Sequence, residues 1–284
     1  MKIEAVKPQI WNFEVVGGKN AWREVAYSAR VSGVPPVVLD EDIFKMIVRN
    51  DYGSALEHII IKFDLKMTKG NTPEFLEHRM ASHSGYSTRY IKADEGIEKE
   101  RPVYEVILPW DLLKLEGEDP IRQEFWKSIS QGIETYEKLL ERGVSRESAR
   151  YTLPFSQAVG IYHVTINLRS LLNLLGLRLC VRTSPEFRCL SAQIYFALLE
   201  QLPIARGLIG CRGFMRGVCP ESEVTGVRKG KQHPHYPPCP FKNPKTKVFI
   251  PVQAEMGNSE SPFSLSEAVE VQERIFKKWA AWEG

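Results

Sequence analysis

The sequence predicts a mixed helix-and-sheet domain of the α/β class (α+β type), followed by an irregular extension that contains cysteine. Three observations support this class. Residues 57–66 alternate apolar side chains with others, as a half-buried strand does. Residues 120–143 carry the wider apolar spacing of a long amphipathic helix. Residues 207–263 are rich in Gly, Pro and Cys and have few periodic apolar positions. We therefore expect a main domain over 1–206 and an extension over 207–284.

The first part of the chain has clear start and stop signals for its elements. Thr72 has the character of an N-cap, and Pro73 suits the first position of a helix. Pro109 ends an apolar, β-rich segment, because proline cannot donate a hydrogen bond to a sheet. The elements expected here, in order, are a helix over 41–50, a strand over 57–66, a helix over 73–82 and a strand over 103–108.

The second part of the chain is expected to be mostly helical. Gly143 closes the long amphipathic helix, and Pro154 stops the short helix that follows it. Ser264 and Glu267 have the spacing of a capping box at the start of the last helix. The helices expected here cover 120–143, 145 to about 154, 158–179 (mostly apolar and therefore buried), 191–206 and 264–281.

Bulk composition excludes some classes of function. The formal net charge is +3, which is too small to indicate nucleic-acid binding without a local cluster. No apolar stretch approaches the roughly 18 residues that a membrane span needs. The N-terminal lysines are not followed by an uninterrupted apolar run, so a signal peptide is not expected. The sequence predicts a cytoplasmic protein with neither nucleic acid nor membrane as a partner.

The stretch 77–90 contains the densest cluster of anion-binding side chains. Arg79 and Arg89 can each form forked, charge-assisted hydrogen bonds to a phosphate, and His78 and several hydroxyl groups lie between or beside them. Composition alone allows a plainer alternative, which is a solvated helix end. The cluster therefore indicates a candidate phosphate site.

Two further patches carry arginine in an apolar context. Arg150 precedes a Leu-Pro pair, and Arg169 lies in the apolar segment 158–179, on the same helical face as Asn173. Burying a guanidinium without a partner costs several kcal/mol, so an anion or a carboxylate is expected to meet Arg169. The alternatives, a ligand contact and an internal salt bridge, stay open at this point.

Together these patches resemble the flavin-dependent thymidylate synthases. The sequence E-H-R-M-A-S-H-S-G-Y-S-T-R-Y stands where that family has R-H-R-x-x-S-x-N-x-x-S-x-R-Y. The segment Ser54–His58 is similar to the family's S-P-F-E-H, and 149–154 to its A-R-x-x-L-P. Residues 167–173, 177–178 and 192–193 are similar to its N-x-R-S-L, L-R and A-Q elements. The resemblance covers roughly residues 20–205, with the motifs in the same order.

The resemblance implies a role for each matching residue. The residues implied to hold FAD are His78, Arg79, Asn167, Arg169 and Asn173, with His58 beside the isoalloxazine as a catalytic group. The residues implied to bind the nucleotide are Ser87, Thr88, Arg89, Arg150 and Arg178. Arg178 would also face the uracil ring and stabilise negative charge as the ring is activated, which makes it catalytic. The implied fold is a catalytic domain with an antiparallel sheet core, assembled as a homotetramer with active sites at subunit interfaces.

The function implied is reductive methylation of dUMP to dTMP, with methylenetetrahydrofolate as carbon donor and NADPH reducing the FAD. Four positions depart from the family pattern: Glu77, Ser84, Gly85 and Ser191. About nine extra residues also follow Arg178. These departures keep two alternatives open, namely another one-carbon transfer such as hydroxymethylation on a different pyrimidine nucleotide, and a non-catalytic metal- and nucleotide-binding protein.

The five cysteines all lie in the C-terminal 105 residues, and their odd number argues against a disulfide framework. Four of the five flank Gly- or Pro-rich segments that lack a core, and some family members look similar here. We therefore expect a metal centre with Cys189, Cys211, Cys219 and Cys239 as ligands and Cys180 as the alternative. A [4Fe-4S] cluster is favoured over zinc because the spacings are long and uneven. The alternative is that the cysteines are simply buried.

Overall fold

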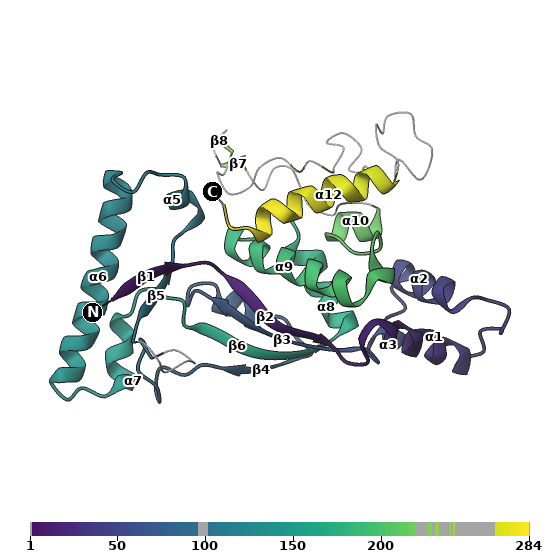
Figure 1. The fold of residues 1–284 in the computed structure, drawn as a ribbon, viewed down its shortest axis with the longest axis horizontal. Coiled ribbons are helices and arrows are strands. Elements are labelled where there is room, and N and C mark those ends of the chain that lie inside the picture. Colours follow the sequence, from purple (N-terminus) through teal and green to yellow (C-terminus); the bar gives the residue numbers. More distant parts are fainter. Residues whose placement is uncertain are drawn as a thin grey trace.

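The computed structural model describes residues 2–95, 102–217, 219, 227–228, 231–232, 239, 241 and 265–283. A four-stranded sheet lies in the middle of the molecule, with helices over one of its faces (Figure 1). A lobe built on the long helix α6 (Pro120–Glu141) stands at one end of this sheet. The helices α1 (Trp22–Val31), α2 (Asp40–Asn50) and α3 (Gly53–Leu56) lie at the other end. The helix predicted over 41–50 is thereby confirmed.

The sheet has the strand order β2–β3–β6–β4, and every neighbouring pair is antiparallel. Along β3 the alternate residues Ile61, Phe63, Leu65 and Met67 are fully buried, which confirms the predicted strand. The antiparallel core implied by the family resemblance is therefore present. The strands are β2 (Gln9–Val15), β3 (Ile60–Met67), β4 (Ala81–Gly85) and β6 (Gly160–Asn167).

Two helices, α8 (Leu168–Arg178) and α9 (Pro185–Gln201), bury their apolar residues in the core that the sheet provides. The side-chain oxygens of Gln193 and Gln201 accept hydrogen bonds of 2.9 and 2.8 Å from backbone N–H groups of β2. Helix α9 begins six residues before the predicted 191–206 segment, because Pro185 can occupy its first turn. The last predicted residues form a separate 3₁₀ turn, Pro203–Ala205.

The single helix predicted over 158–179 is wrong in its first half. Residues 160–167 form strand β6, which pairs with β3 on one side and β4 on the other. Ile161, Val164 and Ile166 are buried, and β-branched side chains of this kind suit a central strand. The helix then begins after Asn167, whose side chain accepts a 2.9 Å hydrogen bond from the backbone of Ser170.

The helix predicted over 73–82 is also shorter than expected. Helix α4 ends at Leu76 (Thr72–Leu76), and its N-cap position is Asn71 rather than Thr72. Met80, which lies between α4 and β4, adopts a left-handed backbone conformation (φ 60°) that a helix extending to residue 82 could not contain. The residues that follow Glu77 therefore connect a helix to an edge strand.

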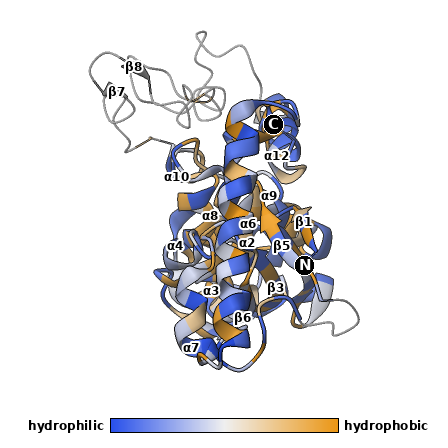
Figure 2. Cartoon of the chain, turned by 90° about the vertical axis from the view of Figure 1, so that its left-hand side faces the viewer, coloured by the Kyte–Doolittle hydropathy of each residue, from blue (hydrophilic) through white to orange (hydrophobic). Residues whose placement is uncertain are grey.

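The α6 lobe has its own small core. Strand β1 (Ile3–Val6) pairs in parallel with β5 (Tyr104–Ile107), and Tyr104, Ile133 and Tyr136 are buried between them and α6. Figure 2, in which α6 stands at the front, shows that the outward surface of this helix is largely hydrophilic. The strand predicted over 103–108 and the helix predicted over 120–143 are confirmed. The lobe also contains α5 (Trp110–Leu113), α7 (Arg146–Ala149) and the 3₁₀ turn Arg150–Thr152.

The C-terminal helix α12 (Leu265–Ala280) confirms the last predicted helix, although Ser264 of its expected capping box lies outside the described residues. Val269 and Phe276 of this helix belong to the same core as the sheet. The guanidinium of Arg188 lies 4.8 Å from the ring centroid of Trp279, which fastens α12 to α9. The described part of the extension also contains the short helix α10 (Arg212–Arg216) and the strand pair β7 (Val227–Arg228) and β8 (Lys231–Gln232). A domain boundary near residue 206 stays a prediction.

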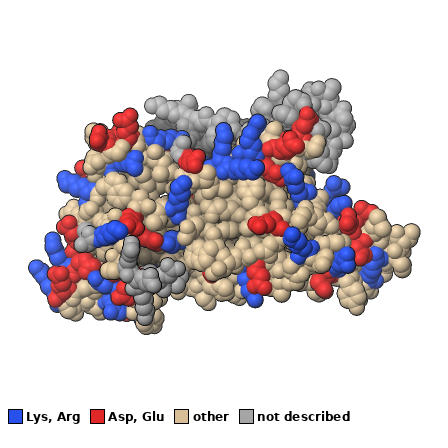
Figure 3. Space-filling model, in the orientation of Figure 1, with Lys and Arg blue, Asp and Glu red and all other residues tan. Residues whose placement is uncertain are grey.

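Charged side chains are interspersed over the surface rather than segregated by sign. Figure 3 shows Lys and Arg beside Asp and Glu across the face that it presents. Within the described part of the chain, no helix is both long and apolar enough to cross a membrane.

Candidate functional site

A cavity of about 760 Å³ opens where α3, α8 and α10 meet the segment after α4, a volume typical of small-molecule sites. It brings together five of the residues predicted to bind the cofactor or substrate: His78, Arg79, Arg169, Asn173 and Arg178. These residues come from segments up to a hundred positions apart in the sequence. We refer to this space as the arginine cavity.

The arginine cavity carries an excess of positive charge. Its carboxylates are Asp51, Glu57 and Glu77. Its arginines are twice as many, and they are Arg49, Arg79, Arg169, Arg178, Arg212 and Arg216. Guanidinium groups suit phosphate and carboxylate oxygens because their planar fork can donate two parallel hydrogen bonds. The charge balance of the cavity therefore fits an anionic ligand.

Arg178, the last residue of α8, is held from three directions. Its Nε donates a 2.8 Å hydrogen bond to Nε2 of His78, and its Nη1 forms an ion pair with Glu74. Its guanidinium also lies 5.0 Å from the ring centroid of Phe187, which comes from the insertion after Arg178. These contacts fix the direction of the guanidinium plane before any ligand binds.

His78 is a buried partner of Arg178. The imidazole is buried and accepts the hydrogen bond from Arg178, so the acceptor nitrogen carries no proton. Burial, and secondarily the charges of Arg178 and His83, lower the pKa of His78 from 6.5 to about 4. The ring is therefore neutral at physiological pH.

Arg169 lies at the start of α8 and pairs with a carboxylate, as one of the sequence-based alternatives expected. Its Nη1 lies 2.5 Å from Oε1 of Glu57, and both side chains are partly exposed at the cavity. A Cβ placed on Gly53 would come within 2.3 Å of the guanidinium, so glycine allows the close approach. Asn167 does not line the cavity, because its side chain caps α8. His58 is exposed and also lies outside the cavity lining.

The residues predicted to grip the nucleotide phosphate form a second group, at the opposite end of β4. The loop after β4 carries Ser87, Thr88 and Arg89, and Nε of Arg89 lies 3.1 Å from Oε1 of Glu147 on α7. Arg150 follows directly after α7. None of these four predicted residues lines the arginine cavity. We refer to them as the phosphate group.

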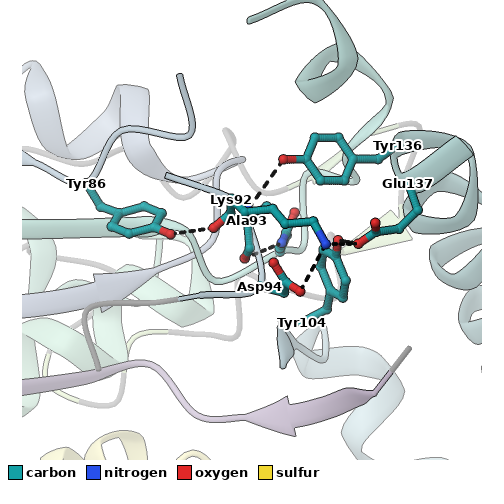
Figure 4. A network of polar contacts seen from close by, with 8 residues as sticks. Tyr86, Lys92, Ala93, Asp94, Tyr104, Tyr136 and Glu137 are labelled. Atoms are coloured by element: carbon teal, nitrogen blue, oxygen red, sulfur yellow. Dashed lines mark hydrogen bonds and ion pairs between the residues drawn. The ribbon is translucent and has the colours of Figure 1, made fainter. Parts of the chain in front are cut away.

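A polar network attaches the loop of the phosphate group to the α6 lobe (Figure 4). The hydroxyl of Tyr86 donates to the backbone oxygen of Lys92 at 2.8 Å, and Nζ of Lys92 lies 3.0 Å from Oε1 of Glu137. Asp94 also pairs with Lys92, and the Tyr104 hydroxyl bonds to Glu137. The loop is therefore anchored at both ends of the segment that carries Arg89.

The five cysteines do not form the predicted centre within the described residues. No group of three or more His, Cys, Asp or Glu side chains there has a geometry that could hold a metal ion. Cys189 packs with Trp282 and donates a 3.5 Å hydrogen bond to the backbone of Ala280. Burial raises the pKa of Cys211, and the nearby thiols of Cys180 and Cys239 add to that rise. The described contacts of Cys189 are to residues near the end of α12, whereas the thiols that affect Cys211 are those of Cys180 and Cys239.

Sequence reasoning missed several residues of the arginine cavity. The sequence does not indicate that Glu74 pairs with Arg178, because the two residues are 104 positions apart. Arg212 and Arg216 lie in a Gly-rich segment with no periodic pattern. Glu77 was recognised as a departure, and the structure places it in the cavity lining.

Comparison with known proteins adds independent information. Residues 18–204 match the family model described as thymidylate synthase complementing protein. The chain is 32% identical over 200 residues to the flavin-dependent thymidylate synthase of Pyrococcus furiosus, a match that covers 66% of this chain and 77% of that relative. It is 34% identical over 177 residues to the enzyme of the same name from Thermococcus onnurineus, covering 60% and 69%.

A solved structure shows the same fold. It is the UMP/dUMP methylase PolB from Streptomyces cacaoi bound with 5-Br dUMP, which superposes with a TM-score of 0.55 at 22% sequence identity. The likeness covers 72% of this chain and 94% of that one. The mixed helix-and-sheet architecture expected from the sequence is therefore shared with a known structure.

Proposed function

The chain belongs to the thymidylate synthase complementing protein family, in which the relatives above are named flavin-dependent thymidylate synthases, and from this premise we propose that it is an enzyme that uses a flavin to methylate a uridine nucleotide. The observation that carries the proposal is the arginine cavity, which gathers His78, Arg79, Arg169, Asn173 and Arg178 in one place. These five residues are among those that the family resemblance implies for cofactor or substrate, whereas the implied residues Asn167 and His58 lie outside the cavity lining.

FAD fits the chemistry of the arginine cavity. A diphosphate carries negative charge, and the arginines of the cavity outnumber its carboxylates. Arg79 and Asn173 would hold the cofactor directly, and Arg169 would do so while it is oriented by Glu57. A bound FAD would supply the hydride that converts a one-carbon unit at the methylene level into a methyl group.

Arg178 is the residue best prepared to act on the uracil ring. Forming a bond at C5 of uracil moves electron density onto the ring and its carbonyl oxygens, so a cation fixed nearby stabilises the transition state more than the ground state. The contacts with His78 and Glu74 hold the guanidinium in one orientation. A neutral His78 can accept the hydrogen bond of Arg178 without placing a second positive charge beside the guanidinium.

The phosphate group would bind the 5′-phosphate of the nucleotide. Arg89 pairs with Glu147 of α7, and Arg150 begins the 3₁₀ turn directly after α7. The loop that carries Arg89 also offers the hydroxyls of Ser87 and Thr88. Arg150 has no ion-pair partner among the described residues, so its charge is available to an anion.

The proposed reaction is the conversion of dUMP to dTMP. In this reaction the methylene carbon of methylenetetrahydrofolate would replace the hydrogen on C5 and tetrahydrofolate would leave, and a bound flavin would supply that carbon with the two electrons and the proton that come from NADPH. The hydrogen lost from C5 departs as a proton. No side-chain nucleophile is required, so Ser87 acts as a binding hydroxyl only.

A second copy of the chain would complete the active site. The arginine cavity and the phosphate group lie at opposite ends of β4, and a strand of five residues spans roughly 17 Å. A nucleotide whose phosphate contacts Arg89 would therefore not bring its uracil ring to Arg178 of the same chain without a large rearrangement. A homotetramer, in which the phosphate group of one subunit faces the cavity of another, removes this difficulty.

One alternative is supported by a specific observation. Glu77 puts negative charge into the cavity where the family signature has arginine. Gly85 stands where members commonly carry Glu, and a Cβ there would lie 2.5 Å from the ring of Tyr162. A site changed at both positions favours a different pyrimidine nucleotide or a different one-carbon product, such as a hydroxymethyl group. Product analysis with UMP and dUMP distinguishes these cases.

The metal centre is proposed only as a feature of the extension. Cys211 and Cys219 are buried, and the thiols of Cys180 and Cys239 act electrostatically on Cys211. Because no group of three or more such side chains among the described residues has a geometry that could hold a metal ion, the family resemblance alone supports a centre at Cys189, Cys211, Cys219 and Cys239, with Cys180 as the alternative. Iron and zinc analysis of anaerobically purified protein tests it, and a metal-free protein in which all five thiols react would refute it.

An absorbance spectrum tests the flavin assignment. Anaerobically purified protein, supplied with FAD, is expected to show flavin bands that disappear when NADPH is added and return in air. Iron–sulfur absorption would add to these bands, whereas zinc adds no colour. A well-folded protein that is colourless after incubation with FAD and removal of the unbound flavin would refute the proposed function.

A further inference from the structure

Helix α10 brings two arginines from outside the family match into the arginine cavity. The match ends at residue 204, whereas Arg212 and Arg216 lie beyond it and line the same cavity as Arg79 and Arg178. The helix is therefore part of the site rather than only part of the extension.

The position of α10 against α8 is set by close packing. A Cβ placed on Gly176 of α8 would come 2.6 Å from the terminal methyl of Met215 and 3.8 Å from the backbone nitrogen of Arg212. Glycine at this position thus allows α10 to lie directly on the α8 turn that precedes Arg178. The two arginines are delivered next to the residue predicted to activate uracil.

The core holds α10 from its other side. Cys211 and Phe214 are buried, and the side chain of Gln272 on α12 donates a 3.2 Å hydrogen bond to the backbone of Ile209, just before the helix. Because these anchors do not involve arginine, neither Arg212 nor Arg216 is needed to fix the helix. Arg212 is half-buried and Arg216 is exposed.

The two arginines also differ from their neighbours in charge pairing. Arg169 and Arg178 are matched by Glu57 and Glu74, so much of their charge is balanced. Neither the Arg212 nor the Arg216 side chain has a hydrogen-bond or ion-pair partner among the residues that the structure describes. Their charge is available to a ligand, in the cavity where Glu77 has replaced an expected arginine.

We propose that Arg212 and Arg216 bind the diphosphate of the flavin cofactor and supply the positive charge that Glu77 withdraws. The inference rests on the proposed function, because it takes FAD as the cofactor. A diphosphate presents two adjacent phosphate groups, and two arginines one helical turn apart can contact both of them at the same time. The nucleotide phosphate has its own basic residues in the phosphate group, at the other end of β4.

Cofactor binding tests this inference without an activity assay. The affinities for FAD and for riboflavin, which lacks phosphate, are measured by flavin fluorescence with wild type, Arg212→Ala, Arg216→Ala and the double variant. Each single substitution is expected to weaken FAD binding about ten- to a hundredfold, because a charged hydrogen-bonding contact contributes about 1.5–3 kcal/mol. Riboflavin affinity is expected to change little.

Two further proteins make the test specific. Arg274→Ala removes an exposed arginine of α12 that does not line the cavity, and its FAD affinity is expected to match wild type. Adding Glu77→Arg to the double variant is expected to restore a measurable part of the lost FAD affinity, which a purely structural role of the arginines would not explain. Circular dichroism and thermal melting confirm that each variant is folded.

The outcomes separate this inference from the proposed function. Unchanged FAD affinity in the folded double variant would overturn the inference while leaving the function intact. Equal losses for FAD and riboflavin would overturn it as well, because phosphate would not be the group contacted. A wild-type protein that binds no FAD would refute the proposed function and the inference together.

Discussion

Nε of Arg178 donates a 2.8 Å hydrogen bond to Nε2 of His78, so the residue expected to face uracil is oriented by a residue expected to touch the flavin. The two belong to different elements, the end of α8 and the turn after α4, and are 100 positions apart. The bond requires an unprotonated acceptor nitrogen, which burial of His78 ensures. The direction of the Arg178 guanidinium thus depends on the charge state of its neighbour.

Substituting Arg178 by lysine tests its role in the transition state. Lysine keeps the positive charge but loses the planar fork that contacts His78 and Glu74 simultaneously. We expect Arg178→Lys to lower kcat by about a hundredfold or more while nucleotide affinity changes less than tenfold. Steady-state kinetics and equilibrium nucleotide binding measure the two effects. Equal losses in both would mean that Arg178 only binds the ground state.

The stability of the protein should depend on the protonation of His78. Its pKa is lowered from 6.5 to about 4 in the folded protein, so the unfolded chain takes up the proton first as the pH falls. The stability that neutral His78 contributes is therefore complete above pH 6.5 and is lost as the pH falls toward 4.

Urea unfolding across this pH range checks that expectation, with His78→Gln as the matched variant. Glutamine retains an acceptor for Arg178 but does not titrate. The free energy of unfolding of wild type should decrease more steeply with falling pH than that of the variant. His83, whose pKa is also lowered by burial, is present in both proteins, so the difference reports His78. Parallel pH profiles would contradict the account.

Removing the charge of Arg150 should weaken nucleotide binding. A charged hydrogen-bonding contact to phosphate contributes about 1.5–3 kcal/mol, so Arg150→Ala is expected to raise the nucleotide Kd about ten- to a hundredfold. Arg142→Ala, an exposed position at the end of α6, provides the control and should leave the Kd unchanged. Titration calorimetry with dUMP gives both values. Wild-type affinity in folded Arg150→Ala would remove Arg150 from the site.

Mixing two impaired variants tests whether the active site is shared between subunits, when dUMP is kept at a concentration at which neither variant alone turns over measurably. Arg150→Ala lacks part of the phosphate group, and Arg178→Ala lacks the ring-facing cation. If each site combines residues from two chains, subunits exchanged in equal amounts should recover about a quarter of wild-type activity, since that share of sites has both residues intact. If both residues serve the same chain's site, mixing recovers nothing.

Several elements could be predicted from the sequence because their signals are local. The alternation along β3 and the apolar spacing of α6 each identify an element without reference to the rest of the chain. Segment 158–179 misleads for a physical reason, because the apolar residues of the central strand β6 run directly into those of helix α8, so apolar composition alone does not mark the change of structure at Asn167. Met80, which lies between α4 and β4, carries no sequence signal for its left-handed conformation.

The candidate site likewise contains residues that could be predicted from the sequence and residues that could not. Motif resemblance identified Arg79, Arg169 and Arg178, and the fold brings them into one cavity. The resemblance could not reveal that Glu74 holds Arg178, because such pairing depends on how α4 meets α8. It also could not place Arg212, since α10 lies outside the matched region.

Product analysis of a single complete reaction tests the central claim most directly. The protein, loaded with FAD, is incubated with dUMP, NADPH and methylenetetrahydrofolate carrying a labelled methylene carbon, and the nucleotides are examined by mass spectrometry. The account predicts dTMP with the label in its methyl group, formed only when FAD is present. Folded, FAD-loaded protein that returns dUMP unchanged, or that yields a hydroxymethylated nucleotide in place of dTMP, would contradict it.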